Sequence, residues 1–215
     1  MRIFVALDID HSIRERITRF LEGVSEFAPE ARWVRPESLH VTLKFIGEKP
    51  PATVDAITRA LAAISAHRFD ITFRGYGFFP TLKAARVFWI GMNSAPPLRR
   101  LAQSVDDATA GLEISREEHE FNPHLTLARG AGGSGVPRWR KSDHPNQHFQ
   151  HLQQKLAALP SPEFGTMTAR EFCLYQSQLM RGGSRYTKLA HFPLLQNTAP
   201  LTPGGSGTGL RHNDQ

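Results

Sequence analysis

The chain contains almost no cysteine and no long apolar run. Cys173 is the single cysteine among 215 residues, and one thiol cannot form a disulfide within the chain. No stretch approaches the roughly 18 consecutive apolar residues that cross a bilayer as a helix. The opening residues 1–8 are too short, and too acidic at their end, for a signal peptide. We therefore expect a cytoplasmic protein of a reducing compartment without a membrane segment.

The chain also lacks an excess of acidic residues. Lys and Arg number 26 against 20 Asp and Glu, which gives a formal net charge of +6 and an isoelectric point near 9.9. A positive balance favours a polyanionic partner such as nucleic acid, although it carries no specificity. With 40% hydrophobic residues, the chain is long enough to bury a core, and we expect one domain or two closely joined lobes.

Apolar residues recur with the period of a strand in some stretches and of a helix in others. Strands are expected at 2–7, 39–46, 69–73, 86–91, 124–129, 167–178 and 186–194, and helices at 12–27, 54–64, 98–108 and 147–159. Gly75 and Gly77 are interpreted as a turn that follows the third strand. Pro, Gly, Ser and Thr dominate residues 197–215, which predicts a disordered tail.

One short motif occurs twice in the chain. His40-Val41-Thr42-Leu43 and His124-Leu125-Thr126-Leu127 are 84 positions apart. Side chains alternate between the two faces of a strand, so each His and its Thr share one face while the apolar residues point to a core. One face of each strand is therefore free for chemistry.

The surroundings of the two motifs are also similar. A gapless shift of 84 residues superposes Arg2 on Arg86 and Phe4 on Phe88 as well as the two motifs. We interpret this as an internal repeat, about 1–84 and 85–196, within one domain that spans 1–196. Two half-covered sheets stabilise themselves by packing together, and a pseudo-two-fold arrangement would set the two His strands side by side.

Two imidazoles that face one pocket can divide acid and base work at neutral pH. An in-line displacement at phosphorus needs a proton removed from the attacking water and another delivered to the leaving oxygen. Thr42 and Thr126 can donate hydrogen bonds to non-bridging phosphate oxygens, and Arg129 can hold the same group with its charge. Each residue also has an ordinary interpretation, as a structural histidine, a strand-favouring threonine or a surface cation.

Three further histidines, His144, His148 and His151, are spaced to line one face of a helix, as in some transition-metal sites. Pro145 interrupts the start of such a helix, and the set has neither Cys nor carboxylate partners. We favour a solvated helix face, and we expect neither a metal nor a cofactor.

The first motif continues as Lys44-Phe45-Ile46-Gly47 and the second as Ala128-Arg129. In this form they resemble the paired motifs of the two-histidine (2H) phosphoesterase superfamily, in particular its RNA 2′,3′-cyclic phosphodiesterase or 2′-5′ RNA ligase branch. The resemblance extends from residue 1 to about 195. It implies a bilobal, pseudo-two-fold α+β fold in which two antiparallel sheets line a central cleft with helices outside.

The resemblance also implies an activity, the hydrolysis of an RNA terminal 2′,3′-cyclic phosphate, or of a cyclic nucleotide, to a 2′-phosphomonoester. Fragments of tRNA are candidate substrates, and a monomer is expected. The resemblance makes His40 the general acid and His124 the general base, and it assigns Thr42, Thr126 and Arg129 to the phosphate.

In the family, the residue at the position of Phe45 stacks on the terminal base. Strict alternation from Val41 and Leu43 turns Phe45 toward the core, so this role requires a bulge in the strand.

Two other functions stay open. RNA end joining is the reverse reaction, with a ribose hydroxyl in place of water, and the sequence does not separate the two. A non-catalytic nucleotide- or RNA-binding module would use the same basic cleft without turnover, but the intact pair of histidines argues against it. Turnover of a nucleoside 2′,3′-cyclic phosphate distinguishes an enzyme from a binding module.

Overall fold

The structure, a computed structural model of the whole chain, describes residues 1–93, 95–130, 147–180 and 183–197. The predicted tail from residue 198 onward and His144 lie outside these ranges. The elements are β1 (Arg2–Asp8), α1 (His11–Val24), the 3-10 turn η1 (Ser25–Phe27), β2 (Arg32–Trp33), η2 (Pro36–Ser38), β3 (His40–Glu48), α2 (Pro51–Ala62), β4 (Phe69–Phe79), β5 (Val87–Asn93), α3 (Ala95–Ala110), β6 (His124–Arg129), α4 (Gln150–Ala157), β7 (Glu163–Ala169), β8 (Glu171–Met180) and β9 (Gly183–Pro193).

The described strands form two sheets. Sheet A has the order β3-β1-β8-β9, and sheet B has the order β2-β6-β5-β4-β7. Every pair of neighbouring strands is antiparallel. The expected α+β class with two antiparallel sheets is therefore confirmed. No helix among the described residues is long and apolar enough to cross a membrane.

The two sheets do not follow the two halves of the sequence. β4 comes from the first half but lies in sheet B, while β8 and β9 come from the second half but lie in sheet A. The single strand expected at 167–178 is wrong, because the chain passes at Arg170 from β7 in sheet B to β8 in sheet A. The turn expected at Gly75 is also wrong: β4 continues through it, with Gly75 at a φ of 67° and a register shift beside it.

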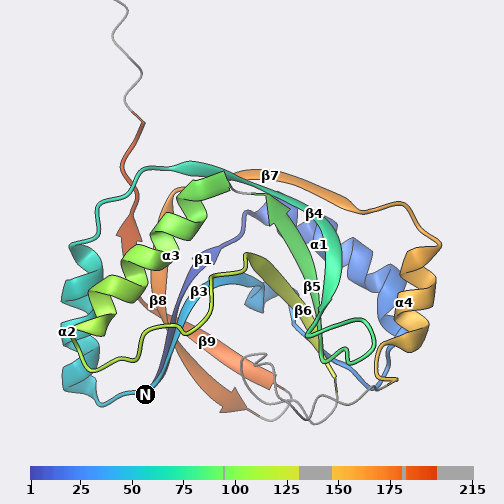
Figure 1. Cartoon of the computed structure of the whole chain (residues 1–215), viewed down its shortest axis with the longest axis horizontal. Helices are drawn as coiled ribbons and strands as arrows, with labels where there is room; N and C mark the ends of the chain where they lie inside the picture. Colours follow the sequence, from blue (N-terminus) through green and yellow to red (C-terminus); the bar gives the residue numbers. More distant parts are fainter. Residues whose placement is uncertain (94, 131–146, 181–182, 198–215) are drawn as a thin grey trace, which may run out of the picture.

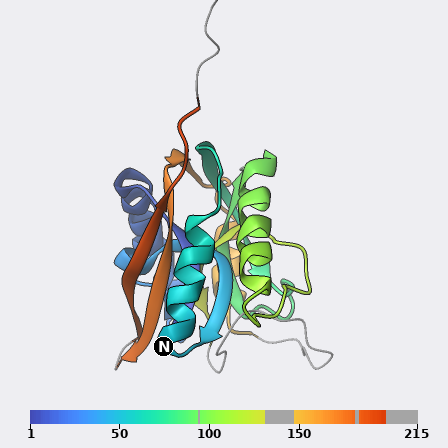
Figure 2. The same ribbon diagram turned by 90° about the vertical axis from the view of Figure 1, so that its left-hand side faces the viewer.

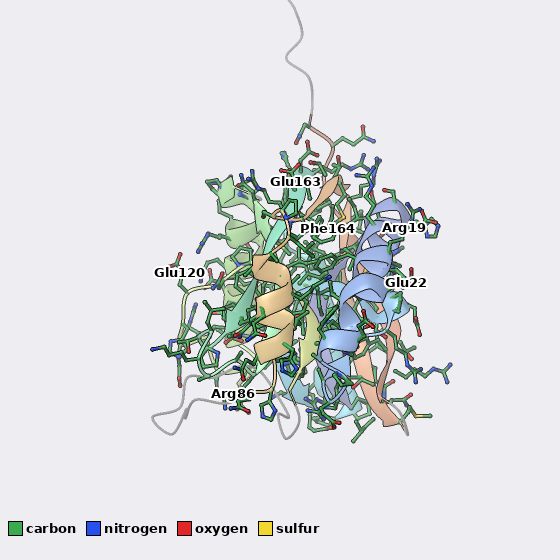
Figure 3. All side chains as sticks on the ribbon, turned by 90° about the vertical axis from the view of Figure 1, so that its right-hand side faces the viewer. Arg19, Glu22, Arg86, Glu120, Glu163 and Phe164 are labelled. Carbon is green, nitrogen blue, oxygen red and sulfur yellow. The ribbon has the colours of Figure 1, made fainter. Side chains whose placement is uncertain are left out.

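The helices lie outside the sheets in two pairs. α1 packs on α4 and β7, and α3 packs on α2 and β3. Figure 1 shows the pairs on opposite sides of the strands, and Figure 2 shows α2 and α3 side by side. α1 buries Ile13, Ile17 and Leu21, which recur every four residues. Its opposite face carries Arg19 and Glu22, which point outward in Figure 3.

One large apolar core holds the sheets and helices together. β1 contributes Ile3, Val5 and Leu7 to this core, whereas Phe4 and Ala6 point to the other face of sheet A and join a smaller cluster. Alternate residues of β1 belong to two different apolar clusters. A shift of this strand by one residue would therefore exchange the residues that face each cluster. The large core therefore fixes which residues of β1 face the second, smaller cluster.

The pairing of the strands corrects one feature of the repeat. Val5 lies opposite Lys44, and Phe88 lies opposite Ala128. Since Lys44 and Ala128 are equivalent in the two motifs, Val5 corresponds to Phe88 and Phe4 does not. The gapless superposition of Phe4 on Phe88 is thus wrong by one residue. Phe88 is a member of the large core, as Val5 is.

Both His strands contain a bulge at the same place. Neighbouring residues of β1 pair with Thr42 and Lys44, and neighbouring residues of β5 pair with Thr126 and Ala128. Leu43 and Leu127 are therefore extra residues, and each is buried together with the residue that follows it. A bulge reverses the alternation beyond it. The next side chains, Phe45 and Arg129, consequently return to the face that carries the histidines.

The bulge turns the charged side chain of Lys44 into the protein. Lys44 is 2% exposed, and its ammonium forms an ion pair with the buried Asp106 of α3 and donates to Ser115 O at 3.0 Å. Asp106 also accepts from the Glu117 amide at 3.1 Å. The pair therefore connects β3 to α3 and to the segment that leads to β6.

Removing one partner of this ion pair should destabilise the protein strongly. Lys44→Ala leaves the Asp106 carboxylate buried, with Arg116 at 3.6 Å as the remaining paired cation among the described residues. We expect a loss of about 3 kcal/mol in the free energy of unfolding, measured by urea denaturation. The exposed Lys83→Ala should change it by less than about 0.5 kcal/mol. Equal stability of the two variants would contradict a structural role for the pair.

Candidate active site

The two His strands meet where sheet A and sheet B come together. β3 and β6 contact each other across the sheets, as Figure 1 shows near the centre of the molecule. His40 and His124 open these strands, and both are partly exposed. The positive charge of a protonated His124 lowers the pKa of His40. The structure therefore brings the two predicted histidines into one electrostatic site.

The same backbone contact orients both imidazoles. Nδ1 of His40 is 2.7 Å from the Ser38 carbonyl oxygen, and Nδ1 of His124 is 2.8 Å from the Asn122 carbonyl oxygen. A carbonyl can only accept, so Nδ1 carries the proton in both rings and donates it. In the neutral form, Nε2 then keeps its lone pair for proton transfer.

Aromatic side chains surround each imidazole. Phe4 and Tyr186 contact His40, with ring centroids 4.8 and 5.1 Å away. Phe79 and Trp89 contact His124, with ring centroids 5.0 and 6.4 Å away. These rings remove water from one side of each histidine and hold its plane.

The two threonines and Arg129 lie on the same faces as the histidines. Thr42 is opposite Ala6, and Thr126 is opposite Trp89. Burial, the largest effect, and the neighbouring cations Arg32 and Arg2 lower the pKa of Arg129, whereas Tyr186 raises it. The charge of Arg129 in turn lowers the pKa of both histidines.

Phe45 lies on the cleft side, contrary to strict alternation. The bulge at Leu43 turns it to the face of His40, where its ring stacks on Phe4 with centroids 5.8 Å apart. The guanidinium of Arg2 lies over the Phe45 ring at 5.1 Å. The condition set by the sequence, a bulge in this strand, is therefore met.

Sequence reasoning missed a polar network beside His40. Asp8 lies opposite His40 in the β1–β3 pair. Its carboxylate accepts from the Tyr175 hydroxyl and, at 2.9 Å, from Lys188 Nζ. Lys188 also reaches Glu171 at 3.2 Å. The sequence contained a signal for this network. Tyr186, which contacts His40, and Lys188 are two residues apart on one strand, so their side chains share a face.

Two groups of potential metal ligands differ in their surroundings. Atoms of Asp8, Glu171 and Cys173 lie within 4.8 Å of one another, but the Lys188 ammonium bonds to both carboxylates and occupies the place of a cation. Burial raises the pKa of Cys173 to about 11, which keeps it a thiol. The prediction that three histidines share one helix face is wrong for His148, which precedes α4, while the exposed His151 lies in α4.

Burial is the largest electrostatic effect on both catalytic candidates. It lowers the pKa of His40 to about 4 and the pKa of His124 below its ordinary value. For His40, the Ser38 carbonyl and the Asp8 carboxylate oppose burial and raise the pKa. Asp8 itself stays ionised, because the hydrogen bonds from Tyr175 and Lys188 outweigh its burial and lower its pKa. Both imidazoles are therefore neutral in the free protein at pH 7.

Removing the Asp8 charge should act on one histidine only. Asp8→Asn should lower the pKa of His40 below its value of about 4, because an anion no longer stabilises the imidazolium. The pKa of His124 should not change. Imidazole ¹⁵N chemical shifts recorded against pH measure both, and the exposed Asp10→Asn is the matched control. An equal shift of both histidines would contradict the assignment of Asp8 to His40.

Comparison with known proteins finds one matching family and several similar proteins. The pattern of the family described as LigT-like phosphoesterase matches the chain twice, at residues 7–89 and 90–186. An RNA 2′,3′-cyclic phosphodiesterase of Archaeoglobus fulgidus is 35% identical over 89% of this chain and 99% of its own length. The Escherichia coli protein of the same name is 30% identical over 91% of this chain and 97% of its own.

Solved structures show the same likeness. The crystal structure of Escherichia coli LigT in complex with 3′-AMP has a TM-score of 0.71 and 29% sequence identity, and covers 91% of this chain and 98% of that one. The complex of the same protein with ATP has a TM-score of 0.68 over 91% and 98% of the two chains. These similar structures hold nucleotides.

Proposed function

Because the chain belongs to the LigT-like phosphoesterase family, we propose that it hydrolyses the terminal 2′,3′-cyclic phosphate of RNA to a 2′-phosphomonoester. One observation carries the proposal: two imidazoles on contacting strands have the same Nδ1–H contact, their Nε2 atoms have no hydrogen-bond partner among the described residues, and their charges interact. The relatives named RNA 2′,3′-cyclic phosphodiesterase span almost the whole chain.

The proposed reaction is an in-line displacement with one proton transfer at each end. His124 Nε2 takes a proton from water as its oxygen bonds to phosphorus. The bond from phosphorus to the 3′-oxygen breaks, and His40 Nε2 gives this oxygen a proton. His40 must therefore be protonated in the reactive complex, although burial keeps it neutral in the free protein.

The substrate supplies the missing charge. An anionic phosphate between the imidazoles stabilises their protonated forms and raises the pKa of both. The Thr42 and Thr126 hydroxyls donate to its non-bridging oxygens, and Arg129 neutralises the charge that grows on them in the transition state. The acid and base states thus arise on binding, in a site where aromatic rings remove water from one side of each imidazole.

Two features favour RNA ends as the substrate class. The chain carries a formal charge of +6, which attracts a polyanion. Phe45 presents an aromatic ring, backed by Phe4, to the face of His40, and bases stack on such rings with little regard to sequence. We therefore assign Phe45 to the base beside the cyclic phosphate.

The direct test is turnover of a nucleoside cyclic phosphate. The protein should convert 2′,3′-cyclic AMP to 2′-AMP at the same rate with and without EDTA, because imidazoles, hydroxyls and Arg129 supply acid, base and charge. Product separation by chromatography measures the rate and the isomer. Activity that EDTA abolishes and zinc restores would contradict the metal-independent mechanism, and binding without turnover would favour the non-catalytic alternative.

Substitution of the histidines should separate their roles. His40→Ala and His124→Ala should each lower kcat by about 10²- to 10⁴-fold, while the exposed His119→Ala leaves it unchanged. An aryl phosphodiester with an activated leaving group needs no proton on departure, so it should restore much of the rate of His40→Ala and little of that of His124→Ala. Equal recovery of both variants would contradict the assignment of acid and base.

A further inference from the structure

Each candidate histidine is oriented by a carbonyl group of the segment that leads into its strand. The Ser38 carbonyl accepts from His40, and the Asn122 carbonyl accepts from His124. Ser38 ends the 3-10 turn η2, while Asn122 lies within residues 118–123, which belong to no helix or strand. The position of each imidazole therefore depends on what holds these two short segments in place.

An arginine of α1 holds the segment before His40. Nη1 of Arg14 donates to the Pro36 carbonyl oxygen, and its Nη2 donates to the Ile9 carbonyl oxygen at 3.3 Å. Pro36 O also accepts from the Leu39 amide at 3.2 Å, which closes η2. Ile9 directly follows β1, whose end pairs with the start of β3. Arg14 therefore joins the two segments that meet at His40.

An arginine of α3 holds the segment before His124. Nη1 of Arg99 donates to the Phe121 carbonyl oxygen at 2.9 Å and forms an ion pair with Glu120. The Phe121 side chain packs on the large core. The hydrogen bond from Arg99 thus lies one residue away from the Asn122 carbonyl that orients His124.

Arg14 and Arg99 occupy equivalent places in the repeat. α1 follows β1, α3 follows β5, and each arginine directly follows a buried residue near the start of its helix, Ile13 or Leu98. The same offset of 85 residues relates Arg14 to Arg99 and Pro36 to the second acceptor, Phe121. Both halves therefore use the same donor on an equivalent backbone carbonyl.

We infer that Arg14 and Arg99 are positioning residues, each of which holds one imidazole in its Nδ1–H form through the segment before the histidine. A neutral imidazole can carry its proton on either nitrogen, and the hydrogen bonds of the ring decide which form is present. When the carbonyl moves away from Nδ1, the Nε2–H form competes, and its Nε2 can no longer accept a proton.

An arginine suits this task, because its planar fork holds two acceptors in a fixed geometry. Arg14 holds two carbonyl oxygens, and Arg99 holds a carbonyl oxygen and a carboxylate. Such supporting hydrogen bonds keep a reacting side chain within the narrow range of positions that catalysis needs. The inference rests on the proposed function for the roles of acid and base, whereas the tautomers of the two histidines do not depend on it.

The direct test is the tautomer of each histidine. Arg14→Met and Arg99→Met keep a long side chain and remove the donors. Imidazole ¹⁵N chemical shifts at about pH 9, where both rings are neutral, measure the Nδ1–H fraction. Arg14→Met should lower this fraction for His40 and leave His124 unchanged, and Arg99→Met should do the reverse.

Two neighbouring arginines provide matched controls. Arg16 lies in α1 and donates to the Phe164 carbonyl oxygen at 3.2 Å, in β7. Arg100 is exposed and follows Arg99 in α3. Arg16→Met and Arg100→Met should leave both histidine tautomers unchanged, and should keep kcat within about twofold of the unsubstituted protein.

Turnover of two substrates then separates positioning from a general loss of structure. Arg14→Met should lower kcat for 2′,3′-cyclic AMP about tenfold. It should lower kcat for an activated aryl phosphodiester less than about twofold, because that leaving group needs no acid at His40. Arg99→Met should lower kcat for both substrates about tenfold, because water still needs the base His124.

Two results would overturn the inference. One is an unchanged tautomer in both Met variants, or an equal change at both histidines in either variant. The other is an equal loss of kcat on both substrates in Arg14→Met, under conditions where His40→Ala itself recovers with the aryl substrate. If a Met variant does not fold, Arg14→Lys or Arg99→Lys replaces it. One ammonium then serves two acceptors, so the same histidine should change by a smaller amount, and an unchanged tautomer overturns the inference.

Failure of the proposed function has a different signature. If the unsubstituted protein does not hydrolyse 2′,3′-cyclic AMP, the catalytic assignment is wrong, and the kinetic comparison no longer applies. The ¹⁵N measurement still decides the role of the arginines. A selective change at one histidine in each Met variant supports it, and the absence of that selectivity overturns it.

Discussion

The whole site depends on one irregularity of backbone pairing, the bulge that follows each threonine. A regular strand would place His40 and Thr42 on the cleft face and send Phe45 into the core. The extra residue at Leu43 reverses the alternation beyond it, so Phe45 faces the cleft. The same event at Leu127 turns Arg129 to the face of His124 and Thr126. Two equivalent bulges thus turn a third side chain of each short strand to the candidate site.

The repeat makes the two halves of the site similar, whereas the proposed roles of acid and base require the two histidines to differ. Both imidazoles donate Nδ1–H to the carbonyl two residues earlier, so their orientation does not distinguish them. The equivalent neighbours do: Asp8 places a carboxylate opposite His40, whereas Gly91, opposite His124, has no side chain. The carboxylate favours the imidazolium of His40 alone.

Burial keeps His40 neutral in the free protein. The aromatic rings around His40 remove the water that would solvate an imidazolium, and the pKa falls to about 4. In the proposed mechanism, a phosphate anion restores the charged state, so protonation and substrate binding are linked. On the core side of β3, the buried Lys44 forms an ion pair with Asp106. This ion pair holds the first His strand to α3.

Local sequence determined much of this protein. The period of apolar residues marked most strands and helices, and the spacing of the two motifs predicted which residues share a face. The resemblance of these motifs correctly implied the α+β class and the family. The selection of His40 and His124 as candidates needed no tertiary information, because a polar residue in an apolar, alternating context is visible in the sequence.

Tertiary structure decided what depends on contacts between distant segments. Alternation alone turned Phe45 the wrong way, and the gapless shift placed Phe4 with Phe88, because a bulge is defined by its partner strand. The passage from β7 to β8 at Arg170 also escaped the sequence, since both strands look alike and only the partners differ. The difference between the neighbours of the two histidines arises in the same way: Asp8 and Gly91 become equivalent only when β1 and β5 pair with the His strands.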